Sequence, residues 1–190
     1  MSHNAFVPRN VVLVGFMGSG KSTIGRGLAW RQGWRFVDTD DVVRRAAGGK
    51  DIPSLFRDEG EAAFRDRETR AIREAASETG QVIATGGGAV LRPENVALLR
   101  AAGTVVWLTA RPDVVVARTA RRAQDRPLLA QGGDDLLAHV LRMLGERGPC
   151  YQAAAHLIVD TSDRPPPVIV EEVRRKMLRA GVSTAEAATS

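Results

Sequence analysis

The chain is poor in cysteine and in long apolar runs, and each shortage excludes a class of protein. Cys150 is the single cysteine among 190 residues, so no disulfide can form within the chain. Lying in a predicted helix beside Tyr151, it is better interpreted as a small apolar residue than as a nucleophile. No apolar run approaches the ~18 residues of a membrane-spanning helix. Residues 1–10 lack the charged start and apolar core of a secretion signal, so we expect a cytoplasmic protein without a membrane partner.

Lysine is also scarce, although the chain is basic. The net charge is +5 at pH 7, yet lysine occurs only at positions 21, 50 and 176, and the remaining basic residues are arginines. Because these arginines are scattered over predicted helices, a solvated surface is the preferred interpretation and no nucleic-acid partner is expected. Individual guanidinium groups can still bind phosphates or carboxylates. The three histidines show no ligand spacing with each other or with Cys150, so no protein-ligated metal centre is predicted.

What the chain does contain is a complete phosphate-binding loop. Residues 15–22 read Gly-Phe-Met-Gly-Ser-Gly-Lys-Ser and follow the apolar run 11–14, which predicts a buried strand. Glycines let backbone N–H groups wrap a polyphosphate, and the following helix turns its positive end toward the anion. We expect Lys21 to reach the β- and γ-phosphates and Ser22 to ligate Mg²⁺. The alternative is an ordinary glycine-rich turn, which the strand before and the helix after the loop disfavour. The residues expected to bind the nucleotide here are Gly18, Ser19, Gly20, Lys21, Ser22 and Thr23.

Short β-like runs alternate with helical patterns along the chain. We predict strands at 10–15, 35–38, 81–85, 104–109 and 156–160. The predicted helices are 21–32, 40–47, 52–57, 61–79, 93–102, 112–121, 134–153 and 167–180. In the seventh helix, the spacing of Leu137, Val140, Leu141 and Leu144 predicts a stripe that faces the core. The alternation predicts an α/β fold, a three-layer sandwich with a central five-stranded parallel sheet, formed by a single domain over residues 1–190.

One segment interrupts this alternation. Residues 121–133 carry charges, Pro127 and a pair of glycines, which predicts a mobile flap between two helices. The small and polar ends, about 1–8 and 181–190, are predicted to fray.

Acidic residues follow the second predicted strand. Asp38 and Asp40 lie two positions apart, so an extended chain would place both carboxylates on one side, at the strand end where ligands bind in parallel sheets. One acid near Mg²⁺ and another near an acceptor hydroxyl would suit phosphoryl transfer. The alternative is helix N-capping, which fits Asp41 and could also account for Asp40.

Three glycines, residues 86–88, end the third predicted strand. Their entropic cost implies that something approaches the backbone closely. Their N–H groups could touch a γ-phosphate or a polar substrate, while Thr85 could hold a magnesium-bound water. A flexible turn before Pro93 is the alternative. In the helix at 61–79, Arg65 and Glu68 lie three residues apart, and this spacing alone favours a surface ion pair.

Taken together, these segments resemble the shikimate kinase family. The matching segments, in chain order, are residues 15–23, Asp38-Thr39-Asp40, Phe64-Arg65 with Glu68, residues 86–88, Arg126-Pro127-Leu128-Leu129, and Arg147 followed by Tyr151. The resemblance covers about residues 10–178. It implies a P-loop kinase fold like that of the nucleoside-monophosphate kinases, with a mobile lid at 121–133. It also implies transfer of the γ-phosphoryl group of ATP to the 3-hydroxyl of shikimate, in aromatic amino acid biosynthesis.

The resemblance further implies a role for each matching residue. Lys21, Asp40 and Arg126 would be catalytic, Arg126 as the lid arginine that meets the phosphates. Ser22 and Asp38 match the magnesium shell. Arg118 and Arg164, with the prolines at 165–166, resemble the segments that sandwich adenine, without deciding which proline stacks. The residues that would hold shikimate are Asp40, Arg65, Gly87, Gly88 and Arg147, with the two arginines at its carboxylate.

Other functions stay open at this point. A kinase of the same architecture with a different acceptor, such as a gluconate kinase, would share the loop but should lack the Arg65, triple-glycine and Arg147 set. A regulatory nucleotide-binding module, or a nucleic-acid binder that uses ATP as a switch, would not need the complete catalytic set. We therefore expect a shikimate kinase that uses ATP and Mg²⁺, has shikimate as its small-molecule partner, and is a monomer.

Overall fold

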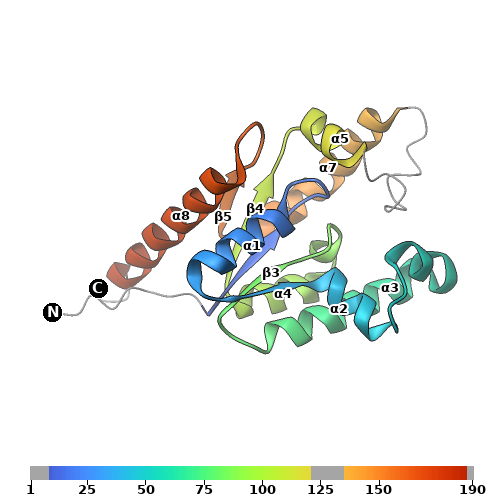
Figure 1. Cartoon of the computed structure of the whole chain (residues 1–190), viewed down its shortest axis with the longest axis horizontal. Helices are drawn as coiled ribbons and strands as arrows, with labels where there is room; N and C mark the ends of the chain where they lie inside the picture. Colours follow the sequence, from blue (N-terminus) through green and yellow to red (C-terminus); the bar gives the residue numbers. More distant parts are fainter. Residues whose placement is uncertain (1–8, 121–134, 188–190) are drawn as a thin grey trace.

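The computed structural model describes residues 9–120 and 135–187. Five parallel strands form one sheet in the order β2-β3-β1-β4-β5 (Figure 1). The strands are β1 Asn10–Val14, β2 Arg35–Asp38, β3 Gln81–Ala84, β4 Thr104–Thr109 and β5 Leu157–Asp160. In this register, Val12 lies opposite both Ile83 and Val105. From β1 the chain moves toward one edge of the sheet and from β4 toward the other, so the connections diverge between these two neighbours. Ligands bind at such a divergence, outside the carboxyl ends of the strands.

The helices are close to the predicted ranges. They are α1 Lys21–Gln32, α2 Thr39–Ala46, α3 Ile52–Ala76, α4 Pro93–Ala102, α5 Pro112–Ala120, α7 Leu136–Ala154 and α8 Pro166–Ala187, with a short 3₁₀ turn η1 at Ala89–Leu91. The break predicted between the helices at 52–57 and 61–79 is present within α3, where Gly60 leaves the helical conformation (φ 80°, ψ 170°) and kinks the element. Helix α8 runs to Ala187, so the predicted end at residue 180 was too early. Within the described ranges, no helix is both long and apolar enough to cross a bilayer.

Helices cover both faces of the sheet, which explains why its strands are apolar without alternation. Val11 and Leu13 face α1 and α8 in one cluster of buried residues, whereas Val12 and Val14 face the other cluster, which contains residues of α3, α4, α5 and α7. Figure 1 shows α1 and α8 side by side on one face, while α2 and the start of α3 project beyond the sheet. A third, smaller cluster joins α2 to α3 there. The predicted three-layer α/β fold is confirmed.

The apolar stripe predicted on α7 was partly wrong. Val140 is fully buried, but Leu137 and Leu141 are 45% and 51% exposed. The buried side of α7 also carries Met143 and Tyr151, and Leu141 is displaced by about 100° around the helix from Val140. The apolar residues of α7 fit two overlapping stripes along the helix, and their spacing alone does not show which stripe faces the sheet. Cys150, on the same helix, is partly buried against the core, as expected of a small apolar residue.

Strand β5 forms one edge of the sheet, and basic side chains from the following segment cover part of its backbone. Lys176 of α8 donates a hydrogen bond from Nζ to the Ile158 carbonyl oxygen at 2.7 Å. Arg164 donates from Nη1 to the Asp160 carbonyl oxygen at 3.1 Å. Two carbonyl groups of the edge strand are therefore paired within the chain.

Candidate active site

The loop between β1 and α1 has the backbone that its glycines predict. Gly18 and Gly20 adopt positive φ angles of 79° and 90°, which side chains other than glycine rarely adopt. A side chain on Gly15 would collide with the Leu108 carbonyl oxygen. Lys21, the first residue of α1, reaches back over the loop and donates to the Gly15 and Phe16 carbonyl oxygens at 2.8 and 2.9 Å. The Lys21 ammonium group therefore lies over the loop, next to the space where a phosphate would bind.

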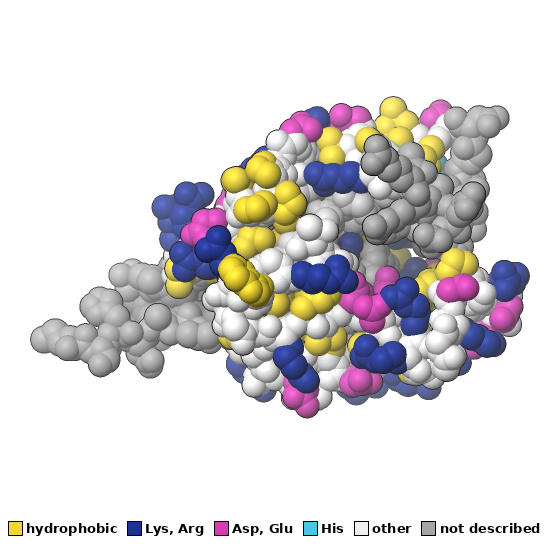
Figure 2. All heavy atoms as spheres, in the orientation of Figure 1, with side chains coloured by type: hydrophobic (Ala, Val, Ile, Leu, Met, Phe, Trp, Pro, Cys, Tyr) yellow, Lys and Arg dark blue, Asp and Glu magenta, His cyan; other side chains and the backbone are white. Residues whose placement is uncertain are grey.

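Two adjoining pockets open at the carboxyl end of the sheet. The loop pocket, of about 680 Å³, contains residues 18–23 together with Thr85, Arg118, Thr161, Arg164 and Pro166. The arginine pocket, of about 380 Å³, contains Arg65, Arg147, residues 86–88 and residues from α2 and α3. Basic and acidic side chains lie side by side around a hollow near α2 (Figure 2). The residues common to both pockets are Met17, Ser22, Asp38, Asp40, Gly86 and Gly87.

Helix α2 is capped by Asp38, and not by Asp40 or Asp41, the residues for which the sequence suggested capping. Asp38 Oδ1 accepts from the Asp40 backbone N–H at 3.1 Å and so caps α2, which begins at Thr39. Its Oδ2 accepts from the Ser22 hydroxyl at 2.8 Å. Asp40 lies in the first turn of the helix rather than on an extended strand, so the two-residue argument for it was wrong. Its carboxylate nevertheless shares a wall with Asp38, because both residues line both pockets.

At Gly86 and Gly88 the absence of a side chain leaves room for charged side chains of the same chain. A Cβ on Gly86 would lie 2.6 Å from Oε1 of Glu68 and 2.9 Å from Oδ1 of Asp40. A Cβ on Gly88 would lie 2.6 Å from Cζ of Arg65, whereas one on Gly87 would meet its nearest atom at an ordinary 3.5 Å. The predicted close approach is confirmed, and at two of the three positions the approaching group is a charged side chain. Thr85 donates its hydroxyl to the Leu13 carbonyl oxygen at 3.3 Å, and its predicted contact with a magnesium-bound water stays a prediction.

Arg65 and Glu68 do form an ion pair, but it is buried, so the surface interpretation was wrong. Arg65 is 8% exposed and Glu68 is 1% exposed, with Nη1 and Oε2 2.9 Å apart. Glu61 also accepts from Arg65 Nη2 at 2.9 Å. Burial raises the pKa of Glu68, and the neighbouring Arg65 opposes that shift. Burial alone would lower the pKa of Arg65, but its attraction to Glu68 and its hydrogen bonds raise the pKa overall.

Helix α7 contributes Arg147 and Tyr151. Arg147 is 8% exposed, lines the arginine pocket and lies 3.5 Å from the Gly87 carbonyl oxygen through Nη1. The Tyr151 hydroxyl donates to the same carbonyl, and its ring stacks on Trp107 with centroids 5.6 Å apart. Burial raises the pKa of Tyr151, so the phenol stays a neutral donor. The sequence pattern placed Tyr151 in a motif without a role, and the structure shows that it anchors Gly87.

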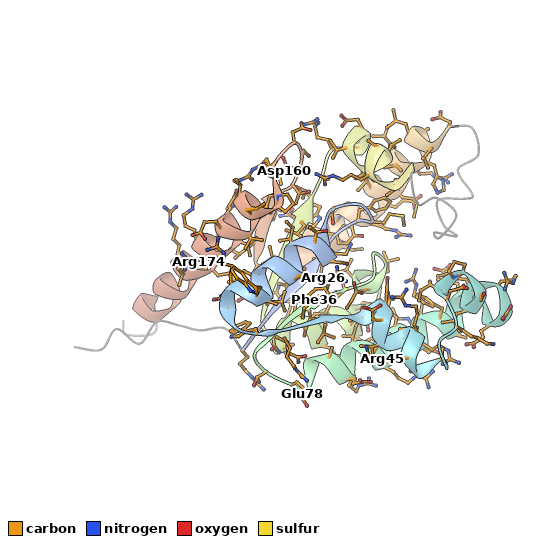
Figure 3. The ribbon with its side chains drawn as sticks, viewed as in Figure 1. Arg26, Phe36, Arg45, Glu78, Asp160 and Arg174 are labelled. Carbon is orange, nitrogen blue, oxygen red and sulfur yellow. The ribbon has the colours of Figure 1, made fainter. Side chains whose placement is uncertain are left out.

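The arginines of the arginine pocket differ in whether a carboxylate of the described residues lies at ion-pair distance. Arg65 pairs with Glu68, and Arg44 pairs with Asp41. Within the described part of the chain, Arg147 and Arg26 have no carboxylate at ion-pair distance. The Arg26 guanidinium lies over the ring of Phe36, 4.9 Å from its centre (Figure 3). Donors for an anion are therefore available in this pocket.

An apolar wall completes the arginine pocket. Ile52, Phe56 and Phe64 of α3 line it, and the centroids of the two phenylalanine rings lie 4.4 Å apart. Sequence reasoning missed this wall, because apolar residues at helical spacing predict a core face rather than a binding face.

Arg118 and Arg164 both line the loop pocket, and neither lines the arginine pocket. Arg118 donates from Nη2 to the Thr161 carbonyl oxygen at 2.7 Å, and Arg164 pairs with Glu172 at 2.5 Å. Pro166 lines the same pocket, which narrows the choice among the prolines. Arg126 and the predicted lid at 121–133 lie outside the described residues, so their roles stay predictions.

Comparison with known proteins decides the family. The family model described as shikimate kinase matches residues 17–178. The chain belongs to the shikimate kinase family. The shikimate kinase of Symbiobacterium thermophilum is 44% identical over 90% of this chain and 98% of its own length. That of Nitratidesulfovibrio vulgaris is 47% identical over 86% of this chain and 92% of its own.

Solved structures of the family agree with the fold. The shikimate kinase of Acinetobacter baumannii, determined in complex with shikimate, superposes with a TM-score of 0.86 at 35% identity, covering 93% of this chain and 96% of that one. The family membership suggested by the motifs is thus confirmed. The roles of individual residues rest on the geometry above.

Proposed function

We propose that the protein transfers the γ-phosphoryl group of ATP to the 3-hydroxyl of shikimate. The observation that carries this proposal is the shared wall between the loop pocket and the arginine pocket. A nucleotide in the first and an acid in the second would meet at Asp40, Gly86 and Gly87. In the reaction the acceptor oxygen bonds to the γ-phosphorus, the bond to the β,γ-bridging oxygen breaks, and the acceptor proton passes to a base.

The loop pocket supplies the nucleotide side. Residues 18–23 wrap the phosphates with backbone N–H groups at the start of α1, and Lys21 neutralises charge on the transferred group. Arg118, Arg164 and Pro166 lie at the far end, where the base would stack against a guanidinium plane and a proline ring. Arg126 would add a further charge from the lid.

Ser22 and Asp38 fit a magnesium ion. Their hydroxyl and carboxylate oxygens lie 2.8 Å apart on the wall shared by the pockets. Mg²⁺ prefers oxygen ligands and commonly keeps several waters beside one or two protein ligands and the substrate phosphates. Ser22 would ligate the ion directly and Asp38 through water, and the ion would neutralise charge on the phosphates.

The arginine pocket supplies the acceptor side. Arg65 and Arg147 come from different helices but both line this pocket, where two guanidinium groups suit one carboxylate. The apolar wall of Ile52, Phe56 and Phe64 would pack against the carbon ring. Backbone groups of Gly87 and Gly88 would contact its hydroxyls.

Asp40 is the candidate base of the reaction. Its carboxylate lies on the wall shared by the two pockets, next to Gly86. From there it would orient or deprotonate the attacking hydroxyl.

The proposal extends to the state of the protein in the cell. The residues assigned here to the nucleotide and to the acceptor all belong to one chain, and we propose that the protein acts as a monomer. We place the protein in the cytoplasm, where ATP is supplied, and give it no nucleic-acid or membrane partner.

A coupled assay of ADP release tests the function. We expect release that requires both shikimate and Mg²⁺, with little release on gluconate or a nucleoside monophosphate. Turnover of gluconate with none of shikimate would refute the acceptor assignment and leave the nucleotide site standing. Absence of ADP release with every acceptor would favour a regulatory module that binds the nucleotide without turnover.

A further inference from the structure

Thr161 connects three separate parts of the fold at the base end of the loop pocket. It directly follows Asp160, the last residue of β5, which is labelled in Figure 3. Thr161 is 1% exposed, yet it lines the loop pocket. Its backbone N–H donates to the Thr109 carbonyl oxygen at 2.9 Å, which fixes it to the end of β4. No motif singled it out in the sequence.

The hydroxyl of Thr161 has three hydrogen-bond partners. It lies 2.9 Å from the Thr109 carbonyl oxygen and 3.1 Å from the Ser19 carbonyl oxygen, so its one proton is shared between two acceptors. It also accepts from Nη1 of Arg118 at 3.1 Å. One buried side chain thereby joins the phosphate-binding loop, the end of β4 and helix α5.

These contacts determine how the Arg118 guanidinium is oriented. Nη2 donates to the Thr161 carbonyl oxygen at 2.7 Å, while Nη1 donates to the Thr161 hydroxyl and to the Gly18 carbonyl oxygen at 3.2 Å. A planar group held at both nitrogens has a fixed plane, and a fixed plane is what stacking requires. The Ser19 carbonyl is held on the side of Thr161, so the Gly20 N–H of the same trans peptide points the opposite way.

We propose that Thr161 is a positioning residue for the nucleotide. Its hydroxyl orients the Arg118 guanidinium and couples that orientation to the phosphate-binding loop, so that the base and phosphate ends of the site are set together. The inference rests on the proposed function only in taking the ligand to be an adenine nucleotide. A purely structural hydroxyl would stabilise the fold without affecting nucleotide affinity.

The test is the substitution Thr161→Val, which keeps the shape and the backbone contacts but removes the hydroxyl. We expect the Kd for MgADP, measured by isothermal titration calorimetry on the full chain, to rise roughly three- to tenfold, the net size of one ordinary hydrogen bond. The KM for ATP should rise in parallel, while the KM for shikimate at saturating ATP stays within about twofold. Thr161→Ser restores the hydroxyl and should restore affinity.

A matched control is available on the neighbouring helix. Thr119 is also 1% exposed and follows Arg118 directly, but its hydroxyl donates to Val115 within its own helix at 2.7 Å. Thr119→Val should therefore leave MgADP affinity unchanged. In an Arg118→Gln background, Thr161→Val should cost little, because the group it orients is absent.

Three results would overturn the proposal: wild-type MgADP affinity in Thr161→Val, equal losses in Thr119→Val, or an undiminished loss without Arg118. If Thr161→Val does not fold, the comparison of Thr161→Ser with Thr161→Ala decides the same question. The titration needs no acceptor, so a failure to phosphorylate shikimate would leave this test intact.

Discussion

Gly88 offers a direct test of how the arginine pocket is built. Its backbone angles, φ −103° and ψ 0°, are open to alanine, so Gly88→Ala brings no backbone strain. The added Cβ would instead lie 2.6 Å from Cζ of Arg65 and closer still to its Nη1, where ordinary contact begins near 3.4 Å. The guanidinium must therefore retreat by about 1 Å.

The size of the effect follows from what Arg65 contacts. Its 2.9 Å hydrogen bond to Glu68 is charge-assisted, and the proposed bond to the substrate carboxylate is of the same kind. Such a bond contributes about 1.5–3 kcal/mol, so the KM for shikimate should rise roughly 10- to 100-fold. The methyl meets the end of a side chain rather than backbone, so the protein should remain folded with a modest loss of melting temperature.

The assay is a shikimate titration at saturating ATP, followed by an ATP titration at saturating shikimate. Only the first should change markedly. The same substitution in an Arg65→Ala background should alter the KM for shikimate by less than about twofold, since the obstructed group has gone. A wild-type KM in Gly88→Ala, or an equal loss with and without Arg65, would show that Gly88 is not reserved for the guanidinium.

Other predictions test the nucleotide side, the base and the pH dependence of stability. Lys21→Ala should lower turnover by a factor of ~10² or more while the melting curve is kept, whereas the exposed Lys50→Ala should be neutral; normal activity in the first would remove Lys21 from the mechanism. Asp40→Asn should lower kcat more than it raises the KM for shikimate, and a pure KM effect would make Asp40 a binding residue. His156 accepts from the Val105 N–H through Nδ1 at 2.9 Å, and burial holds its pKa below the ordinary value of about 6.5. The unfolded chain then takes up the proton first, so the free energy of unfolding should fall as pH drops below about 6.5. Urea titrations at a series of pH values should show this fall in the free energy of unfolding in the wild type and a smaller fall in His156→Gln. An equal pH dependence in the two proteins would contradict the assignment.

Much of the fold could be predicted because local patterns and packing agree. The strands are buried on both faces, so each appears as a short apolar run between turn signals. The break predicted at Gly60 is found as well, because this residue leaves the helical conformation between two helical stretches. An error arose where the local pattern was ambiguous. On α7 the apolar residues Leu137 and Leu141 continue the spacing of the buried Val140 but are about half exposed.

The site was predictable to the extent that its chemistry lies in contiguous motifs. The phosphate-binding loop is one such motif, and the three glycines are another. Thr161 carries no comparable signal, because its role arises from contacts between distant parts of the chain. The hydroxyl of Thr161 meets the carbonyl of Ser19 across 142 positions. The apolar wall of α3 has the spacing of an ordinary core face, which does not mark it as a binding surface. Burial also changed the meaning of a pattern, since Arg65 and Glu68 have the spacing of a surface pair but lie inside the protein.

The basic side chains that contact strand β5 affect how readily the protein associates with itself at high concentration. An edge strand with open carbonyl groups is a template on which another strand can add, and this is a common route to aggregation. Here Lys176 and Arg164 occupy the carbonyls of Ile158 and Asp160, so an incoming strand would have to displace two charged donors and bring its own backbone against them. Lys176 of α8, together with Arg164 just before that helix, therefore disfavours self-association at this edge, while α8 also covers one face of the sheet.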